Sequence, residues 1–246
     1  MARSFLIRGM LCGIVGGLLM FLFAKFFGEP SVDAAIGIEE QIAKAAGDAP
    51  EPVLVSRALQ AGWGLLTGAI PYSIAVGGLF SLVFAFCWGR MGRLGARASS
   101  ALIAGASLVT IYLVPNLKYP ANPPSVGNPE TIGYRTYLYF GMIIISIAAM
   151  VAAINLGKSL VGRFDKWHST IIAGAVYLAV ISIAFAVMPN IDEVPKQFPA
   201  TLLWQFRLSA LGMQLILWTT LGLLFGELTE RSMARSGPRQ SALRRV

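Results

Sequence analysis

Apolar residues in this chain fall into six long runs that contain no Asp, Glu, Lys or Arg. The runs are Gly9–Ala24, Ala58–Gly89, Ala98–Leu117, Thr136–Gly157, Trp167–Ile191 and Leu208–Gly226. A helix needs roughly 20 apolar residues to cross the bilayer core, and five runs reach or approach that length. The first run is shorter, but Phe26 and Phe27 extend it and Lys25 can reach outward to the interface. The pattern predicts an all-α membrane protein with six transmembrane helices.

The predicted spans define the organisation of the chain. We expect them at about 5–27, 62–89, 98–115, 135–157, 168–188 and 206–226. The inner connections are short and the outer ones are long, which predicts a bundle of three hairpins with elaborated extracytoplasmic loops. Residues 1–231 are expected to form this single domain, and residues 232–246 a disordered, basic cytoplasmic tail. The loop segment Glu29–Ala46 begins with a proline that suits a helix start, and we expect a short amphipathic helix on the outer surface.

Charge gives the orientation of these spans. Only 13% of the residues are charged, against about 25% in a typical soluble domain. With the N-terminus in the cytoplasm, thirteen basic and three acidic residues face inward, while seven basic and nine acidic residues face outward. These are net charges of +10 and −2, which add up to the formal charge of +8. The positive-inside rule therefore predicts cytoplasmic N- and C-termini. The basic balance needs no nucleic-acid partner, and no motif for one is present.

A cleaved signal peptide is the alternative interpretation of the first run. Arg3 and Arg8 before an apolar core fit such a peptide, but Phe26-Phe27-Gly28 is a poor cleavage site.

The predicted spans contain few side chains that could take part in catalysis, proton transfer or metal binding. The spans hold no ionisable residue at mid-depth of the kind that proton-coupled transporters use. The sole histidine, His168, lies at the inner interface beside Trp167. One histidine forms neither a metal cluster nor a hydrolase triad, so we expect no enzyme activity, and these residues identify no cofactor. Gly9, Gly13 and Gly17 lie four residues apart, which predicts close helix packing within the chain or between copies in a homo-oligomer.

A proline-rich segment, "VPNLKYPANPPSVGNPETIG" (Val114–Gly133), follows the third run. Proline lacks the N–H group and clashes with the preceding turn, so the sequence predicts that this segment is not helical. We expect a rigid plug or vestibule near the mouth of the bundle, because prolines reduce the conformations available.

The predicted outer face gathers carboxylates and arginines. Oxygen ligands there could meet a divalent cation, and the candidate ligands are Glu29, Asp33, Glu40, Asp192 and Asn122. An arginine stands near the start of each returning helix, namely Arg57, Arg135 and Arg207. We expect these arginines to form buried or half-buried pairs with outer carboxylates or loop carbonyls. The alternative is a solvated acidic surface in which the arginines only tie loop to helix.

Six stretches together resemble the CbtA family of predicted cobalt transporter subunits. They are "FGEPSVDAAIGIEE", "VSRALQAGWGLLTG", "GGLFSLVFAFCWGRMGRLG", "LKYPANPPSVGNPETIGYRT", "VPKQFPATLLWQFRLSALGMQLILW" and "GLLFGEL". The resemblance runs from about Arg3 to Arg231. It implies a multi-pass protein of the bacterial inner membrane, with Co²⁺ as the transported ion. It also implies a small one-helix partner with a histidine-rich terminus, which is CbtB-like.

One stretch departs from the family pattern. Many relatives carry histidines in the first outer loop, whereas this chain has "QIAKAAGDAPEPVL" (Gln41–Leu54) with none. Histidine is the usual transition-metal ligand near neutral pH, so a partner would have to supply nitrogen ligands. The sequence predicts a membrane subunit for uptake of cobalt or another divalent cation. The alternative is a non-transporting scaffold or assembly subunit that binds another membrane protein.

Overall fold

The computed structural model describes residues 2–47 and 54–243, with side chains described as far as Arg235. In this part of the chain, six helical stretches are long and apolar enough to cross a membrane by length and composition. They confirm the all-α, six-span prediction, and no strand occurs among the described residues. The chain divides into two compact units, Met1–Gly105 with Trp204–Val246 and Ala106–Leu203. We call them the first and second units and describe each separately.

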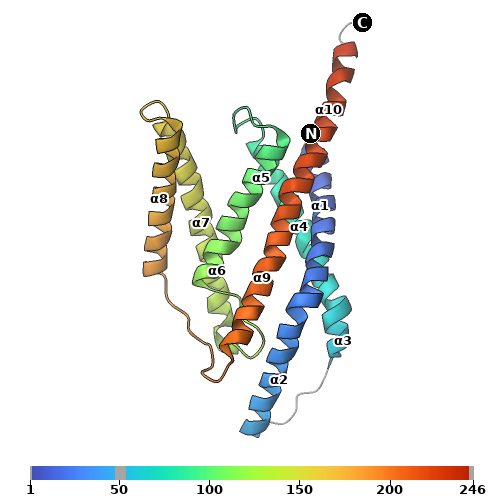
Figure 1. The fold of residues 1–246 in the computed structure, drawn as a ribbon, viewed down its shortest axis with the longest axis vertical. Coiled ribbons are helices and arrows are strands. Elements are labelled where there is room, and N and C mark those ends of the chain that lie inside the picture. Colours follow the sequence, from blue (N-terminus) through green and yellow to red (C-terminus); the bar gives the residue numbers. More distant parts are fainter. Residues whose placement is uncertain (1, 48–53, 244–246) are drawn as a thin grey trace. The chain divides into compact units, whose positions relative to one another are not determined.

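In the first unit, the helices are built from several successive segments (Figure 1). The first span joins α1 (Ala2–Phe23), the π-helical η1 (Ala24–Gly28) and α2 (Glu29–Ala46). The second joins α3 (Arg57–Leu59), the π-helical η2 (Gln60–Gly64) and α4 (Leu65–Cys87). The last joins α9 (Ala200–Thr220), the π-helical η5 (Leu221–Phe225) and α10 (Gly226–Leu243).

The helix expected over Glu29–Ala46 is present with those bounds, but its expected placement flat on the outer surface is wrong. It continues α1 through η1 without a break (Figure 1). Pro30 at the start of α2 lacks an N–H group that would require an acceptor, so a π-helical turn can pass into the next helix. The helix α10 continues to Leu243. The predicted disorder of residues 232–246 stays a prediction. The single domain predicted over residues 1–231 also stays a prediction.

The core of the first unit is a glycine contact between α1 and α4 beside a cluster of aromatic rings. Gly9 and Gly77 lie so close that a side chain on either would meet the backbone of the other. Phe5 of α1 packs edge-on against Phe84 of α4, with ring centroids 5.4 Å apart. Phe225 of η5 lies 4.9 Å from the same Phe84 ring. Small residues therefore bring the backbones together, and aromatic rings fill the adjoining space.

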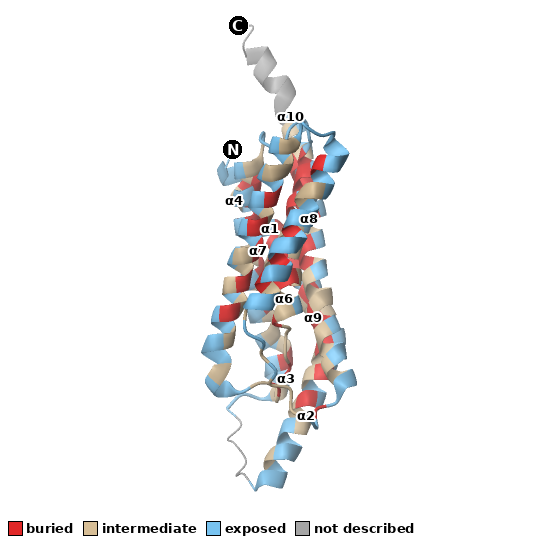
Figure 2. Cartoon of the chain, turned by 90° about the vertical axis from the view of Figure 1, so that its left-hand side faces the viewer, coloured by how far each residue is buried: buried red, intermediate tan, exposed pale blue. Residues whose placement is uncertain are grey.

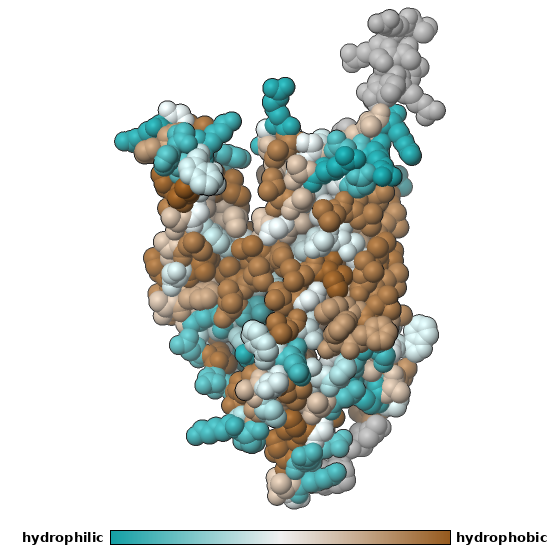
Figure 3. Space-filling view, in the orientation of Figure 1, coloured by the Kyte–Doolittle hydropathy of each residue, from teal (hydrophilic) through white to brown (hydrophobic). Residues whose placement is uncertain are grey.

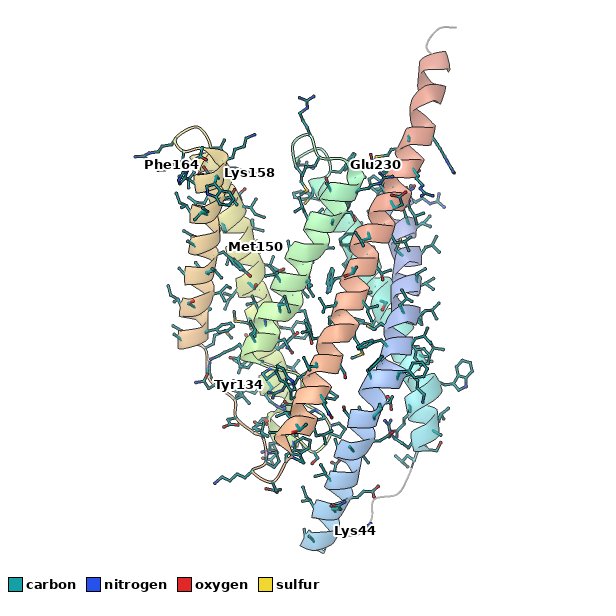
Figure 4. The ribbon with its side chains drawn as sticks, in the orientation of Figure 1. Lys44, Tyr134, Met150, Lys158, Phe164 and Glu230 are labelled. Carbon is teal, nitrogen blue, oxygen red and sulfur yellow. The ribbon has the colours of Figure 1, made fainter. Side chains whose placement is uncertain are left out.

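The second unit holds the paired helices α7 (Ile132–Leu160) and α8 (Lys166–Val187), joined by the short connection of residues 161–165. Buried residues along their shared face include Met142 and Ile181. Ser146 and Tyr177 form a buried hydrogen bond of 2.9 Å between the two helices. Figure 4 places Lys158 and Phe164 at the end of this pair that carries the short connection, and Tyr134 toward the other end.

The third span passes from the first unit into the second. It consists of α5 (Ala96–Ser107), the π-helical η3 (Leu108–Leu113) and α6 (Val114–Lys118). The prediction that Val114–Gly133 is not helical is therefore wrong for its first five residues, and also for Ile132 and Gly133, which begin α7. Pro115 falls in the first turn of α6, where its missing N–H group needs no partner within that short helix. The prolines after Lys118 do end the helix, and the chain stays irregular until the 3₁₀ turn η4 (Pro129–Thr131).

The helices bury only part of their surface. Figure 2 shows buried positions along inward-facing stripes, with exposed positions on the remaining faces. Large apolar side chains lie on the exposed faces, among them Phe86 of α4, Phe140 of α7 and Leu178 of α8. In Figure 3 hydrophobic colour dominates the middle part of the helices that it shows, and hydrophilic colour gathers toward their upper and lower ends. This distribution is the one that contact with lipid requires. The predicted arrangement in three hairpins stays a prediction.

Candidate functional site

In the first unit, Arg57 joins the start of the second span to α2. Its Nε donates to Asp33 Oδ1 at 2.7 Å, and its Nη2 donates to Glu29 Oε2. Glu29 and Asp33 are one turn apart on α2, so both carboxylates face the same guanidinium. Ser56 caps the short α3, since its hydroxyl accepts from the N–H group of Leu59. The cap and the ion pairs together fix where the chain re-enters the helix.

This arrangement bears on the predicted metal ligands Glu29 and Asp33. Each already places an oxygen on Arg57, so a cation at this place would compete with a guanidinium. Glu40 lies further along α2 and is exposed. Among the described residues, no group of three or more His, Cys, Asp or Glu could hold a metal ion. The predicted ligands stay a prediction.

In the second unit, Glu193 holds the loop after α8 against the start of α7. Its Oε1 accepts from Thr131 Oγ1 at 2.7 Å, and its Oε2 accepts from the N–H group of Asn128 at 2.8 Å. Arg135 Nε lies 3.4 Å from Oε2. These donors favour the ionised carboxylate, so the Thr131 hydroxyl first, the Asn128 N–H next and the Arg135 charge last lower the pKa of Glu193.

Arg135 lies against a tight bend of the proline-rich loop. Its Nη2 donates to the carbonyl of Asn128 at 3.2 Å. Gly127 has φ = +112°, and a side chain there would run into the guanidinium. The backbone conformation at position 127 therefore favours glycine, and a side chain there would displace the Arg135 guanidinium. The predicted contacts of Arg57 and Arg135 with Glu29, Asp33, Glu193 and a loop carbonyl are all present. Arg207 is half-buried on α9 in the first unit.

Two further residues tie the proline-rich loop to the end of α8. Lys118 Nζ donates to the carbonyl of Phe185 at 2.8 Å and to the side chain of Asn190. The Tyr119 hydroxyl donates to the carbonyl of Pro189 at 2.8 Å. Burial raises the pKa of the Tyr119 phenol, which keeps it a neutral donor. The sequence prediction did not include these three hydrogen bonds. The sequence contained a signal for two of these hydrogen bonds, because the similar segments "VPNLKYP" and "MPNIDEVP" close spans three and five. The first segment contains Lys118 and Tyr119, and the second contains their partners Asn190 and Pro189.

A cavity of about 460 Å³ lies under this loop, entirely within the second unit. Its lining combines aromatic, amide, aliphatic and one charged side chain, and consists of Tyr112, Asn116, Tyr119, Pro120, Ala121, Asn122, Val126, Ile132, Arg135, Thr136, Tyr139 and Ile191. The predicted ligand Asn122 is part of this wall. Asp192, the other ligand predicted in this unit, is exposed and is not part of it.

A second charged cluster in the first unit involves α10. Glu230 Oε2 accepts from the N–H groups of Ala96 at 2.6 Å and Arg97 at 3.3 Å, so it caps the start of α5. Figure 4 shows Glu230 beside that helix end. Glu227 pairs with both Arg97 and Arg231. Both carboxylates of this cluster are thus committed to local contacts.

Comparison with known proteins decides the family. The family model described as "Probable cobalt transporter subunit (CbtA)" matches residues 2–230, nearly the whole chain. The chain belongs to the CbtA family. No curated protein and no solved structure matches it.

For this CbtA-family chain, the match covers both units and all six long helices. The family is one of transporter subunits, so the resemblance noted from the sequence and the prediction of a membrane transport protein are confirmed. A subunit family also implies partner subunits.

Proposed function

We propose that this chain is a membrane subunit of a cobalt uptake system in a bacterial inner membrane, with both termini in the cytoplasm. The observation that carries the proposal is the family match over residues 2–230 of a chain with six membrane-spanning helices. The orientation is supported by charge within each unit. In the first unit, Arg90 and Arg93 lie in the connection after α4, and Arg97 lies in the first turn of α5. In the second unit, Lys158 lies in the last turn of α7, and Arg163 lies in the short connection to α8.

We also infer a small partner with a histidine-rich terminus. The described residues offer no cluster of metal ligands, and the sequence contains one histidine. Imidazole binds cobalt(II) well, whereas carboxylate and carbonyl oxygens discriminate weakly among divalent ions. A partner that supplies nitrogen ligands would provide the affinity that this chain lacks. Oxygen atoms on the outer face would then contact the ion first. Glu29 and Asp33, which lie one turn apart on α2, are the candidate pair.

Uptake of radiolabelled cobalt by cells tests this function. Cells would carry the chain alone, the chain with the partner, or the pair in which the chain has Glu29→Gln with Asp33→Asn. We expect uptake above empty-vector cells for the pair and a loss in the double variant. Glu39→Gln is the matched control, since Glu39 is an exposed carboxylate on the same helix. Equal uptake in all strains, at the empty-vector level, would contradict transport and favour a scaffold.

A second variant separates a metal ligand from a structural ion pair. Arg57→Gln leaves Glu29 and Asp33 in place without their cation. If the two carboxylates meet the transported ion, uptake should persist or rise, because a competing charge is gone. If they serve only to hold Arg57, this variant should lose membrane-inserted protein to the same extent as the double carboxylate variant. Immunoblots of the membrane fraction measure that amount beside the uptake.

A further inference from the structure

The cavity under the proline-rich loop has the size and lining of a site for a small organic molecule. Its volume of about 460 Å³ lies within the range of roughly 300–1,000 Å³ for ligand pockets. Such pockets combine apolar and aromatic walls with a few polar groups. Here Val126, Ile132 and Ile191 supply aliphatic surface, and three tyrosines supply rings. The prolines of the loop hold this wall in place, because each restricts its own backbone.

Charge in the wall favours an anion. Arg135 is the one charged residue in the lining. Its Nε is buried without a hydrogen bond, and the 3.4 Å to Glu193 exceeds the length of about 2.7–2.9 Å for a charge-assisted hydrogen bond. Both carboxylate oxygens of Glu193 already accept from Thr131 and Asn128. The loop therefore holds Arg135 in place through Nη2, and the buried Nε faces Glu193. The remaining N–H groups on the Nη atoms have capacity for a second carboxylate in the cavity that Arg135 lines.

The same wall is poorly suited to a bare divalent cation. It contains no Asp, Glu, His, Cys or Met. The side-chain oxygen of Asn116 accepts from the N–H group of Ala121 at 3.1 Å, and the Tyr119 hydroxyl donates outward to Pro189. A guanidinium in the wall also repels a cation. The aromatic surface of Tyr112, Tyr119 and Tyr139 favours a flat or partly apolar ligand instead.

We propose that this cavity binds a small, carboxylate-bearing organic anion, with the carboxylate on Arg135 and the body of the ligand against the tyrosines. The anion could arrive free or as the ligand shell of a metal ion, since both forms present carboxylate oxygens at their surface. The free form stands without the proposed transport function. The metal-bearing form rests on it, and means that cobalt reaches this chain as an organic complex.

Calorimetric titration of the full chain in lipid nanodiscs tests the proposal. Three probes separate the sources: pyridine-2,6-dicarboxylate alone, the anionic complex of one cobalt(II) ion between two molecules of it, and cobalt(II) chloride. Binding of both organic probes supports carboxylate recognition in general. Binding of the complex alone supports the metal-bearing source. The proposal is overturned if neither organic probe binds, whether or not cobalt chloride binds.

Variants place the probe in this cavity. Arg135→Lys keeps the charge but loses the planar fork of donors, so we expect binding roughly tenfold weaker. Ala121→Leu leaves the charge untouched and fills the space, and should also weaken binding. Lys196→Gln is the matched control, because it removes an exposed positive charge from the same unit outside the lining. Binding unchanged in both Arg135→Lys and Ala121→Leu would overturn the assignment. Because titration does not measure uptake, this result is independent of whether the chain transports cobalt.

Discussion

The contact of α1 with α4 depends on glycine, and Gly13→Ala tests it most directly. An ideal Cβ at Gly13 would lie 2.9 Å from the carbonyl carbon of Ser73 and 3.0 Å from the Cα of Ile74, and closer still to the Ser73 oxygen. All three atoms belong to the backbone of α4, so no side-chain rotation can make room. The two helices would have to move apart along the whole seam, including the contact of Gly9 with Gly77.

The magnitude follows from two opposing effects. Overpacking a well-filled interior costs about 1–3 kcal/mol, and a backbone clash belongs at the upper end of that range. Alanine is favoured over glycine inside a helix by roughly 0.5–1 kcal/mol, which offsets part of the loss. The net destabilisation of Gly13→Ala should be about 2 kcal/mol. At about 2–4 °C per kcal/mol for a chain of this size, the melting temperature should fall by about 4–8 °C.

The assay is thermal unfolding of the purified chain in detergent, with Gly68→Ala as the matched control. Gly68 lies on α4 itself, and a Cβ there would meet no atom within 4 Å. That variant should gain helix propensity without a clash and melt at the wild-type temperature or above. Equal melting of Gly13→Ala and Gly68→Ala would refute the reasoning, because it would mean that the seam can open at no cost.

Three further outcomes follow from single contacts. Glu230→Gln should lower the free energy of unfolding by about 1 kcal/mol, measured by the same melts, because a neutral amide is a weaker cap for α5; an unchanged melt would contradict the cap. The pKa of Glu193 is lowered in the folded chain, so its carboxylate contributes stability above the ordinary glutamate value of about 4.3, and this contribution is lost as pH falls through the lower folded value. Melts from neutral pH down past that value should fall less steeply for Glu193→Gln, and parallel curves would contradict it. With the native cysteines removed, Cys at Leu94 should react with a membrane-impermeant maleimide only after the cells are opened, and Cys at Glu130 in intact cells; the reverse would contradict the orientation.

The sequence was sufficient to predict the helices. Runs without charge can cross a bilayer only as helices, because every backbone group must then bond within the segment. The start of α2 was predictable because Pro30 is compatible with a first turn and with little else in a helix. The same reasoning gave a wrong prediction at Pro115, which lies in the first turn of the short helix α6. The sequence does not show where the preceding helical segment ends, so it does not show that this proline falls in a first turn.

Helix pairing was harder to predict than helix position. In lipid, neighbouring helices gain no hydrophobic burial by which to recognise each other, so pairing depends on the fit of small and large side chains. The glycines of α1 gave part of that information, because their spacing of four residues requires a close neighbour. The glycines of α7 and α8 show no such spacing of four residues. The contact of these helices rests on apolar residues, on Gly157 against Ala173, and on the hydrogen bond between Ser146 and Tyr177.

The sequence was sufficient to predict that Arg57 and Arg135 contact carboxylates or loop carbonyls. Arg57 and Arg135 stand where a helix leaves the polar region, and a half-buried guanidinium needs acceptors there. The cavity was not predictable, because it depends on where the irregular backbone after Lys118 turns. Besides the prolines, the bend at Gly127, with its positive φ, and the hydrogen bond of Tyr119 to Pro189 help to hold the wall in place. Neither feature has a periodic sequence pattern.

The arginine contacts also change what the outer carboxylates can offer a metal ion. Arg57 with Glu29 and Asp33 leaves a net charge of −1, and Arg135 with Glu193 leaves none. A divalent cation is attracted by the summed field of a site rather than by its count of carboxylates. By net charge, the Arg57 cluster attracts a bare cobalt ion only weakly and the Arg135 cluster does not attract it, whereas the N–H donors of Arg135 can still bind a carboxylate by hydrogen bonds. Strong binding of the free ion would then need ligands from another subunit. Because this chain has a single histidine to offer cobalt as a nitrogen ligand, there are two hypotheses: a partner supplies the ligands, or cobalt arrives as an organic complex that binds in the cavity. Cobalt uptake that depends on the partner but not on Arg135 would favour the partner hypothesis. Cobalt uptake that requires both an added organic chelator and Arg135 would favour the cavity hypothesis.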